Sequence, residues 1–172
     1  MDDWDSVELA DPPLDYNWVT DRLAVGAGIW TGRNMELLAR DGITHVVDMQ
    51  AEFDDSLIAE GTGIQVLWNP CDDDFEEKPP HLLRRGVEFA AAALRDPRAR
   101  VYFHCSAGVH RGPMMLLACL AAGGMDLVQA MELIRQSRPE ADFPDVYRRS
   151  VIRFLETLAG STSQVSSFKF QV

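Results

Sequence analysis

The chain has 172 residues, of which 47% are hydrophobic and 25% charged, and this composition is typical of one globular domain with a substantial core. Its net charge of −11 disfavours nucleic acids and anionic membranes as partners, because both are bound through basic surfaces. No segment approaches the ~18 consecutive apolar residues that a membrane span requires. We therefore expect neither a nucleic-acid partner nor a membrane span.

The three cysteines, Cys71, Cys105 and Cys119, do not have the spacing of a metal site. We therefore expect no metal and no cofactor. Residues 1–10 are acidic and lack the apolar run of a signal peptide. These features favour a cytoplasmic location, where the reducing environment would keep a reactive thiol intact.

Hydrophobic periodicity and turn residues predict strands that alternate with helices. The expected strands cover residues 17–20, 23–26, 43–48, 64–68 and 100–103, and the expected helices cover 32–40, 79–94, 113–122, 126–136 and 145–158, with a short helix within 52–60. This order predicts a single α/β domain at residues 15–159, with a mostly parallel sheet of four to five strands flanked by helices. An acidic arm (residues 1–14) and a Ser-rich tail (160–172) would flank the domain.

One stretch, residues 101–113, combines the groups of a reactive site: Val-Tyr-Phe-His-Cys-Ser-Ala-Gly-Val-His-Arg-Gly-Pro. An apolar strand ends at Cys105, five residues separate it from Arg111, and a helical pattern follows. Backbone N–H groups of such a loop, together with the helix N-terminus, can surround an anion. The guanidinium of Arg111 can bind two phosphate oxygens at once. A cysteine in that field is expected to be a thiolate, so the loop predicts phosphoryl transfer to sulfur.

His-Cys-x5-Arg, with Gly108 three residues after the cysteine, resembles the signature of cysteine-dependent protein phosphatases. Chain length and motif placement resemble the dual-specificity group, and the resemblance covers residues 15–158. It implies a phosphorylated protein as substrate, with phosphotyrosine first and phosphoserine or phosphothreonine as further candidates. It also implies Cys105 as the nucleophile that forms a thiophosphate. The phosphate-binding residues it implies are Ser106, Ala107, Gly108, Val109, His110 and Arg111.

The reaction also needs a carboxyl group that protonates the leaving oxygen. Asp72, Asp73 and Asp74 follow a predicted strand and would lie at the same end of the sheet as Cys105. The resemblance favours Asp73, while Asp72 and Asp74 remain alternatives, as does a merely solvated acidic turn. His104 either orients the loop or simply packs at the strand end, and Arg138 either binds a second phosphate or is structural.

Gly112 departs from the family pattern, in which Ser or Thr follows the motif arginine and assists breakdown of the thiophosphate. Gly112-Pro113 is similar to the Ala-Pro of the phosphatases of regenerating liver. The glycine leaves open a second interpretation, a slow or inactive module that only binds phosphoproteins. A rhodanese-like sulfurtransferase fits the Asp turn and Pro113 less well. The loop lacks lysine, which disfavours a lipid head group as substrate.

Overall fold

A five-stranded sheet in the order β1-β2-β5-β3-β4 forms the centre of the protein. The computed structural model describes residues 10–160, and in it β5 is the middle strand, buried along its whole length. Only β1 runs antiparallel to its neighbour, so the prediction of a mostly parallel sheet is confirmed. The strands are β1 (Tyr16–Trp18), β2 (Leu23–Gly26), β3 (His45–Gln50), β4 (Gln65–Cys71) and β5 (Val101–His104).

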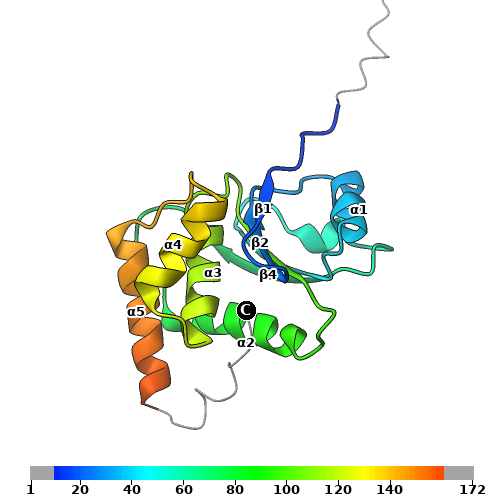
Figure 1. Cartoon of the computed structure of the whole chain (residues 1–172). Coiled ribbons are helices and arrows are strands. Elements are labelled where there is room, and N and C mark those ends of the chain that lie inside the picture. Colours follow the sequence, from blue (N-terminus) through cyan, green and yellow to red (C-terminus); the bar gives the residue numbers. More distant parts are fainter. Residues whose placement is uncertain (1–9, 161–172) are drawn as a thin grey trace, which may run out of the picture.

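Helices cover both faces of the sheet (Figure 1). One face carries α1 (Gly32–Arg40) with the short 3-10 helix η1 (Asp55–Leu57), and the other carries α2 (Pro80–Leu94), α3 (Arg111–Ala122), α4 (Leu127–Ser137) and α5 (Asp145–Ala159). Helix α3 is buried along nearly its whole length, because it lies between the sheet and the three other helices of its face. No helix among these residues is long and apolar enough to span a membrane.

Successive residues of the central strands point to opposite faces of the sheet and build two cores. The larger core, beneath α2 to α5, receives Val25, Val47 and Phe103, and the smaller one, beneath α1, receives Ala24, Val46 and Tyr102. The parallel register places these residues side by side across β2, β5 and β3. The same register brings the carboxyl ends of the strands to one edge, where the loop after β5 begins.

Several boundaries differ from the sequence prediction, including those of β1 and β3, and three of the differences bear on the site. β4 continues to Cys71, since the buried side chain of Asn69 donates to the Leu82 carbonyl oxygen (2.9 Å) and an edge strand tolerates Pro70. Helix α3 begins at Arg111, because a proline in the first turn has no N–H that the helix would use. The short helix predicted within 52–60 is only the 3-10 turn η1. The predicted arm and tail fall largely on residues 1–9 and 161–172, outside the described residues.

Candidate active site

The loop between β5 and α3 has its carbonyl groups bound on the outside. The carbonyl oxygen of Cys105 accepts from His104 Nδ1 (3.1 Å), that of Ser106 from Gly28 N (3.0 Å) and that of Ala107 from Arg138 Nη2 (3.2 Å). The carbonyl oxygen of Gly108 accepts from Arg138 Nε (2.7 Å), that of Val109 from Asp142 N (2.9 Å) and that of His110 from Met114 N (2.9 Å). By contrast, the N–H groups of residues 106–110 have no acceptor within residues 10–160. The loop therefore presents a row of free donors, as an anion-binding loop does.

Arg138 holds this loop from behind. Its side chain is fully buried and forms two hydrogen bonds to the Asp15 carboxylate, both 3.0 Å, in addition to those to the loop carbonyls. Gly108, whose carbonyl it binds, has φ +68°, and a Cβ there would lie 2.4 Å from the Gly26 carbonyl carbon. Of the two roles considered for Arg138, the geometry supports the structural one.

Cys105 and Arg111 lie at the two ends of the loop, and both are almost completely buried, at 3% and 4% exposure. Arg111 Nη1 donates to Glu52 Oε1 (2.6 Å) and to the Cys71 carbonyl oxygen (2.9 Å), and Nη2 donates to Glu52 Oε2 (3.0 Å). Arg111 Nε is buried without a partner among the described residues. The Nε edge of the guanidinium is therefore available for an oxyanion while Glu52 holds the other end.

The sequence analysis missed Glu52. The hydrogen bonds that Arg111 donates to Glu52 are the main reason that the pKa of Glu52 is lowered to about 2. The Ser106 hydroxyl donates a further hydrogen bond to the same carboxylate. Gln50 Nε2 donates in turn to that hydroxyl (3.1 Å). A carboxylate just after β3, at the same end of the sheet as Cys105, was the signal that could have identified it.

Of the three candidate acids, Asp73 is the one that faces the loop. Its Oδ2 accepts from His110 Nδ1 (3.0 Å) and its Oδ1 from the Tyr147 hydroxyl (2.8 Å). Asp74 instead binds Lys78 Nζ at 2.6 Å, and this hydrogen bond lowers the pKa of Asp74, so it is held as a carboxylate. Asp72 is exposed to solvent. Tyr147 on α5 is a second residue that the sequence did not indicate.

The family model of the dual-specificity phosphatase catalytic domain matches residues 29–157. The chain belongs to the dual-specificity phosphatase family. The resemblance seen in the sequence is thereby confirmed.

Two curated relatives of this dual-specificity phosphatase share 30% identity with it. Protein phosphatase Slingshot homolog 3 of Mus musculus matches over 114 residues, 64% of this chain and 16% of that protein. A probable protein tyrosine phosphatase type IVA B of Dictyostelium discoideum matches over 90 residues, 51% of this chain and 53% of that protein. The chain thus spans about half or less of these relatives. The structure of PTPMT1 in complex with PI(5)P has the same fold, with a TM-score of 0.76 at 20% identity over 86% of this chain and 98% of that chain.

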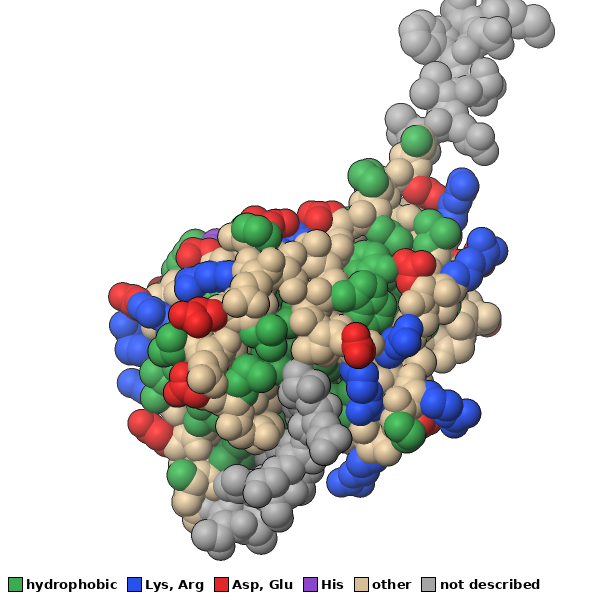
Figure 2. All heavy atoms as spheres, viewed as in Figure 1, with side chains coloured by type: hydrophobic (Ala, Val, Ile, Leu, Met, Phe, Trp, Pro, Cys, Tyr) green, Lys and Arg blue, Asp and Glu red, His purple; other side chains and the backbone are tan. Residues whose placement is uncertain are grey.

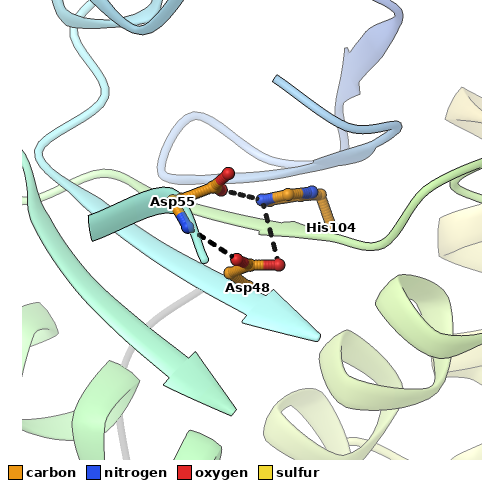
Figure 3. Close-up of side chains that lie close together, drawn as sticks. All are labelled: Asp48, Asp55 and His104. Carbon is orange, nitrogen blue, oxygen red and sulfur yellow. Dashed lines mark hydrogen bonds and ion pairs between the residues drawn. The ribbon is translucent and has the colours of Figure 1, made fainter. Parts of the chain in front are cut away.

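Behind the loop of this phosphatase domain lies a buried network of two carboxylates and a histidine (Figure 3). His104 contacts Asp55 through Nε2 and the Cys105 carbonyl oxygen through Nδ1, at 3.1 Å. Both partners are acceptors, so the imidazolium satisfies both contacts. Burial alone would lower the pKa of His104, but the hydrogen bond that His104 donates to Asp55 and the charges of Asp55 and Asp48 outweigh it and raise the pKa.

The same three side chains offer one possible metal ligand each, within 4.8 Å of one another. Most of these atoms already have protein partners, since Asp48 accepts the N–H groups of Gln50 (2.9 Å) and Asp55 (3.0 Å) and His104 is bonded to Asp55. Only Asp55 Oδ1 lacks a partner in the part of the chain that the structure describes. The group therefore fits a proton-sharing network better than a metal centre.

Proposed function

We propose that this protein is a cysteine-dependent phosphatase that hydrolyses phosphotyrosine in proteins, with phosphoserine and phosphothreonine as further substrates. The observation that carries the proposal is the set of free donors beside Cys105. The N–H groups of residues 106–110 and the buried Arg111 Nε all lack protein partners among the described residues. A buried donor without a partner, such as Arg111 Nε, is costly, and a phosphate dianion would satisfy it together with the loop N–H groups.

In the first step, the Cys105 sulfur attacks phosphorus and the bond to the leaving oxygen breaks. The three remaining phosphate oxygens are held by the loop N–H groups and the Arg111 fork as negative charge spreads over them. Asp73, in its protonated form, donates its proton to the leaving oxygen. The products of this step are the free alcohol or phenol and a Cys105 thiophosphate.

In the second step, water attacks the thiophosphate and releases inorganic phosphate and the Cys105 thiolate. Asp73, now ionised, is the group on the loop side that can accept the proton of that water. Apart from the substrate and water, both steps use only groups of this chain. We therefore propose a reaction without metal, and activity that persists in EDTA is the expected result.

An aromatic ring beside the loop favours phosphotyrosine. Phe75 is 56% exposed, stacks on Tyr147 with ring centroids 6.0 Å apart, and meets the edge of His110 at 5.2 Å. A substrate phenyl ring that contacts Phe75 would gain about 0.5–1.5 kcal/mol beyond its burial.

The test is hydrolysis of p-nitrophenyl phosphate and of a phosphotyrosine peptide by the full chain. Cys105→Ser and Arg111→Ala should each abolish turnover, because one removes the nucleophile and the other the charge clamp. Cys119→Ala, which changes a buried cysteine of α3 outside the loop, is the matched control and should retain activity. Substantial turnover in purified, folded Cys105→Ser protein would refute the proposal. Tight binding of the phosphopeptide without turnover by the wild type would instead support the binding module.

A further inference from the structure

The segments around the loop carry carboxylates and no exposed lysine or arginine. We define the acidic rim as the acidic residues of three segments, 51–54, 72–77 and 139–142: Glu52, Asp54, Asp72, Asp73, Asp74, Glu76, Glu77, Glu140 and Asp142. All but Asp54 are exposed, and Asp54 is half-buried. The neighbouring Lys78 is buried and bound to Asp74.

Each segment of the acidic rim contacts the phosphate-binding loop directly. Glu52 binds Arg111, and Asp73 lies 3.0 Å from His110 Nδ1. Asp142 approaches the other ring nitrogen of His110 at 3.4 Å, and its N–H donates to the Val109 carbonyl oxygen (2.9 Å). The acidic rim is thus part of the wall of the site rather than a remote surface.

One exposed basic side chain, Arg153 of α5, contacts the acidic rim through an ion pair with Glu77, and others lie away from the loop. Several of them belong to segments that precede the strands, at the opposite end of the sheet from the loop: Arg40, Arg95, Arg98 and Arg100. In Figure 2, basic side chains gather at the right and lower right, where Figure 1 places α1 and the end of α2, and also at the left edge, where Figure 1 places α5. The three segments that border the loop are therefore acidic, whereas the opposite end of the sheet carries exposed arginines.

We propose that the acidic rim selects phosphorylated protein segments that carry lysine or arginine next to the phosphoresidue. The inference rests on the proposed function, since the free donors of the loop bind the phosphate and the acidic rim contacts what surrounds it. Charges within about 8 Å interact at physiological salt, so basic neighbours of the phosphoresidue are attracted and acidic ones repelled. A polyphosphorylated lipid head group would bring further negative charge against the same carboxylates.

The experiment compares three phosphotyrosine peptides that are identical except at the two residues on either side of the phosphotyrosine, which are all arginine, all alanine or all glutamate. The kcat/KM should decrease in that order, with at least about a tenfold difference between arginine and glutamate at low salt, and the difference should shrink at high salt. p-Nitrophenyl phosphate, which has no flanking charge, serves as the reference substrate.

A charge reversal on the acidic rim should reduce this preference. Glu76→Lys should lower the arginine-to-glutamate ratio of kcat/KM at least about threefold, and any effect on the phosphate group itself cancels in this ratio because all three peptides carry the same phosphotyrosine. Glu156→Lys, the same substitution at an exposed position of α5, is the matched control and should leave the ratio intact.

Three results would overturn the inference, and they are distinguishable. Equal kcat/KM for the three peptides would remove the charge selection while the phosphatase activity stands. Faster hydrolysis of vesicle-bound phosphatidylinositol phosphate than of the arginine peptide would identify a lipid substrate. No turnover of p-nitrophenyl phosphate or of any peptide would refute the proposed function, and the inference with it.

Discussion

Glu52 binds Arg111 end-on, with Nη1–Oε1 and Nη2–Oε2 distances of 2.6 and 3.0 Å, and leaves the Nε edge free. The carboxylate therefore fixes the plane of the guanidinium without occupying the edge proposed for phosphate. Glu52 is ionised at working pH, because its pKa is lowered to about 2, chiefly by Arg111. The contribution of this ion pair to stability is complete above the ordinary pKa of 4.5 and is lost as the pH falls through about 2.

The first prediction is that Glu52→Gln lowers kcat/KM by about tenfold and Glu52→Ala by up to about a hundredfold, because a hydrogen bond to a charged group contributes ~1.5–3 kcal/mol. Both variants should bind phosphate analogues such as vanadate more weakly, which is measured as a higher inhibition constant. Glu60→Gln, a change of an exposed carboxylate outside the acidic rim, is the control. An unchanged vanadate constant in Glu52→Ala would show that Arg111 needs no such support.

The second prediction concerns the acid. Asp73→Asn should slow the hydrolysis of phenyl phosphate at least about a hundredfold but affect p-nitrophenyl phosphate far less, because its leaving group needs little protonation. Asp72→Asn and Asp74→Asn are the matched controls. If Asp74→Asn gave this leaving-group dependence instead, Asp74 would be the general acid despite its contact with Lys78.

The third prediction is that Asp55 positions Cys105 through His104. Asp55→Asn removes the charge that favours the imidazolium, so the rate of Cys105 alkylation by iodoacetamide at neutral pH should fall by about tenfold. The groups that face the sulfur from other elements, Arg111 and Cys71, are unchanged in this variant.

A double-mutant cycle separates this role from general destabilisation. In a His104→Asn background, Asp55→Asn should have little further effect on the alkylation rate, because the histidine through which it acts is absent. The alkylated cysteine is identified by peptide mapping. Equal changes of rate in both backgrounds would mean that Asp55 acts by another route.

The fourth prediction concerns the pH dependence of stability. Burial raises the pKa of Asp48 to about 7, against an ordinary 3.8, and the pKa of His104 is raised as well. A raised pKa means that the folded state holds the proton more tightly, so both groups contribute stability at low pH that is lost as the pH rises through the folded pKa. The Tm should therefore fall between about pH 4 and pH 7, the interval between the two pKa values of Asp48, and Asp48→Asn should flatten that slope. A Tm that rises over this range would contradict the assignment.

The sequence predicted the features that depend on local order. The strand periodicity, the Cys105-to-Arg111 spacing and the Asp turn after β4 are all contained in short stretches, and their elements appear in the structure. The contacts that support the loop join distant residues, with Glu52 and Arg111 59 positions apart and His104 and Asp55 49 apart. Such pairs meet only because β3 lies beside β5 in one register, which no local pattern specifies.

Gly112 shows how the structure refines an expectation from the sequence. The glycine replaces the family hydroxyl that assists breakdown of the thiophosphate, so slow breakdown is expected from the sequence alone. The structure adds that a Cβ at Gly112 would lie 3.0 Å from His104 Cα, 3.2 Å from its carbonyl carbon and 3.3 Å from Cys105 N. These atoms are backbone, and they belong to the nucleophile's own segment. A side chain at this position therefore requires these backbone atoms to move by a few tenths of an ångström.

The fifth prediction separates the two effects with a matched pair of variants. Gly112→Ala adds only the Cβ, so it should slow the first turnover, seen as the rate of the p-nitrophenol burst, by about tenfold. Gly112→Ser adds the hydroxyl as well and should slow the burst equally. The lost hydrogen bond to the leaving sulfur corresponds to ~1.5–3 kcal/mol, so steady-state turnover in Gly112→Ser should exceed that in Gly112→Ala about ten- to a hundredfold. The wild type should release one equivalent of p-nitrophenol quickly and then turn over slowly. Equal steady-state rates in the two variants would show that breakdown of the thiophosphate in this chain does not depend on a hydroxyl after Arg111.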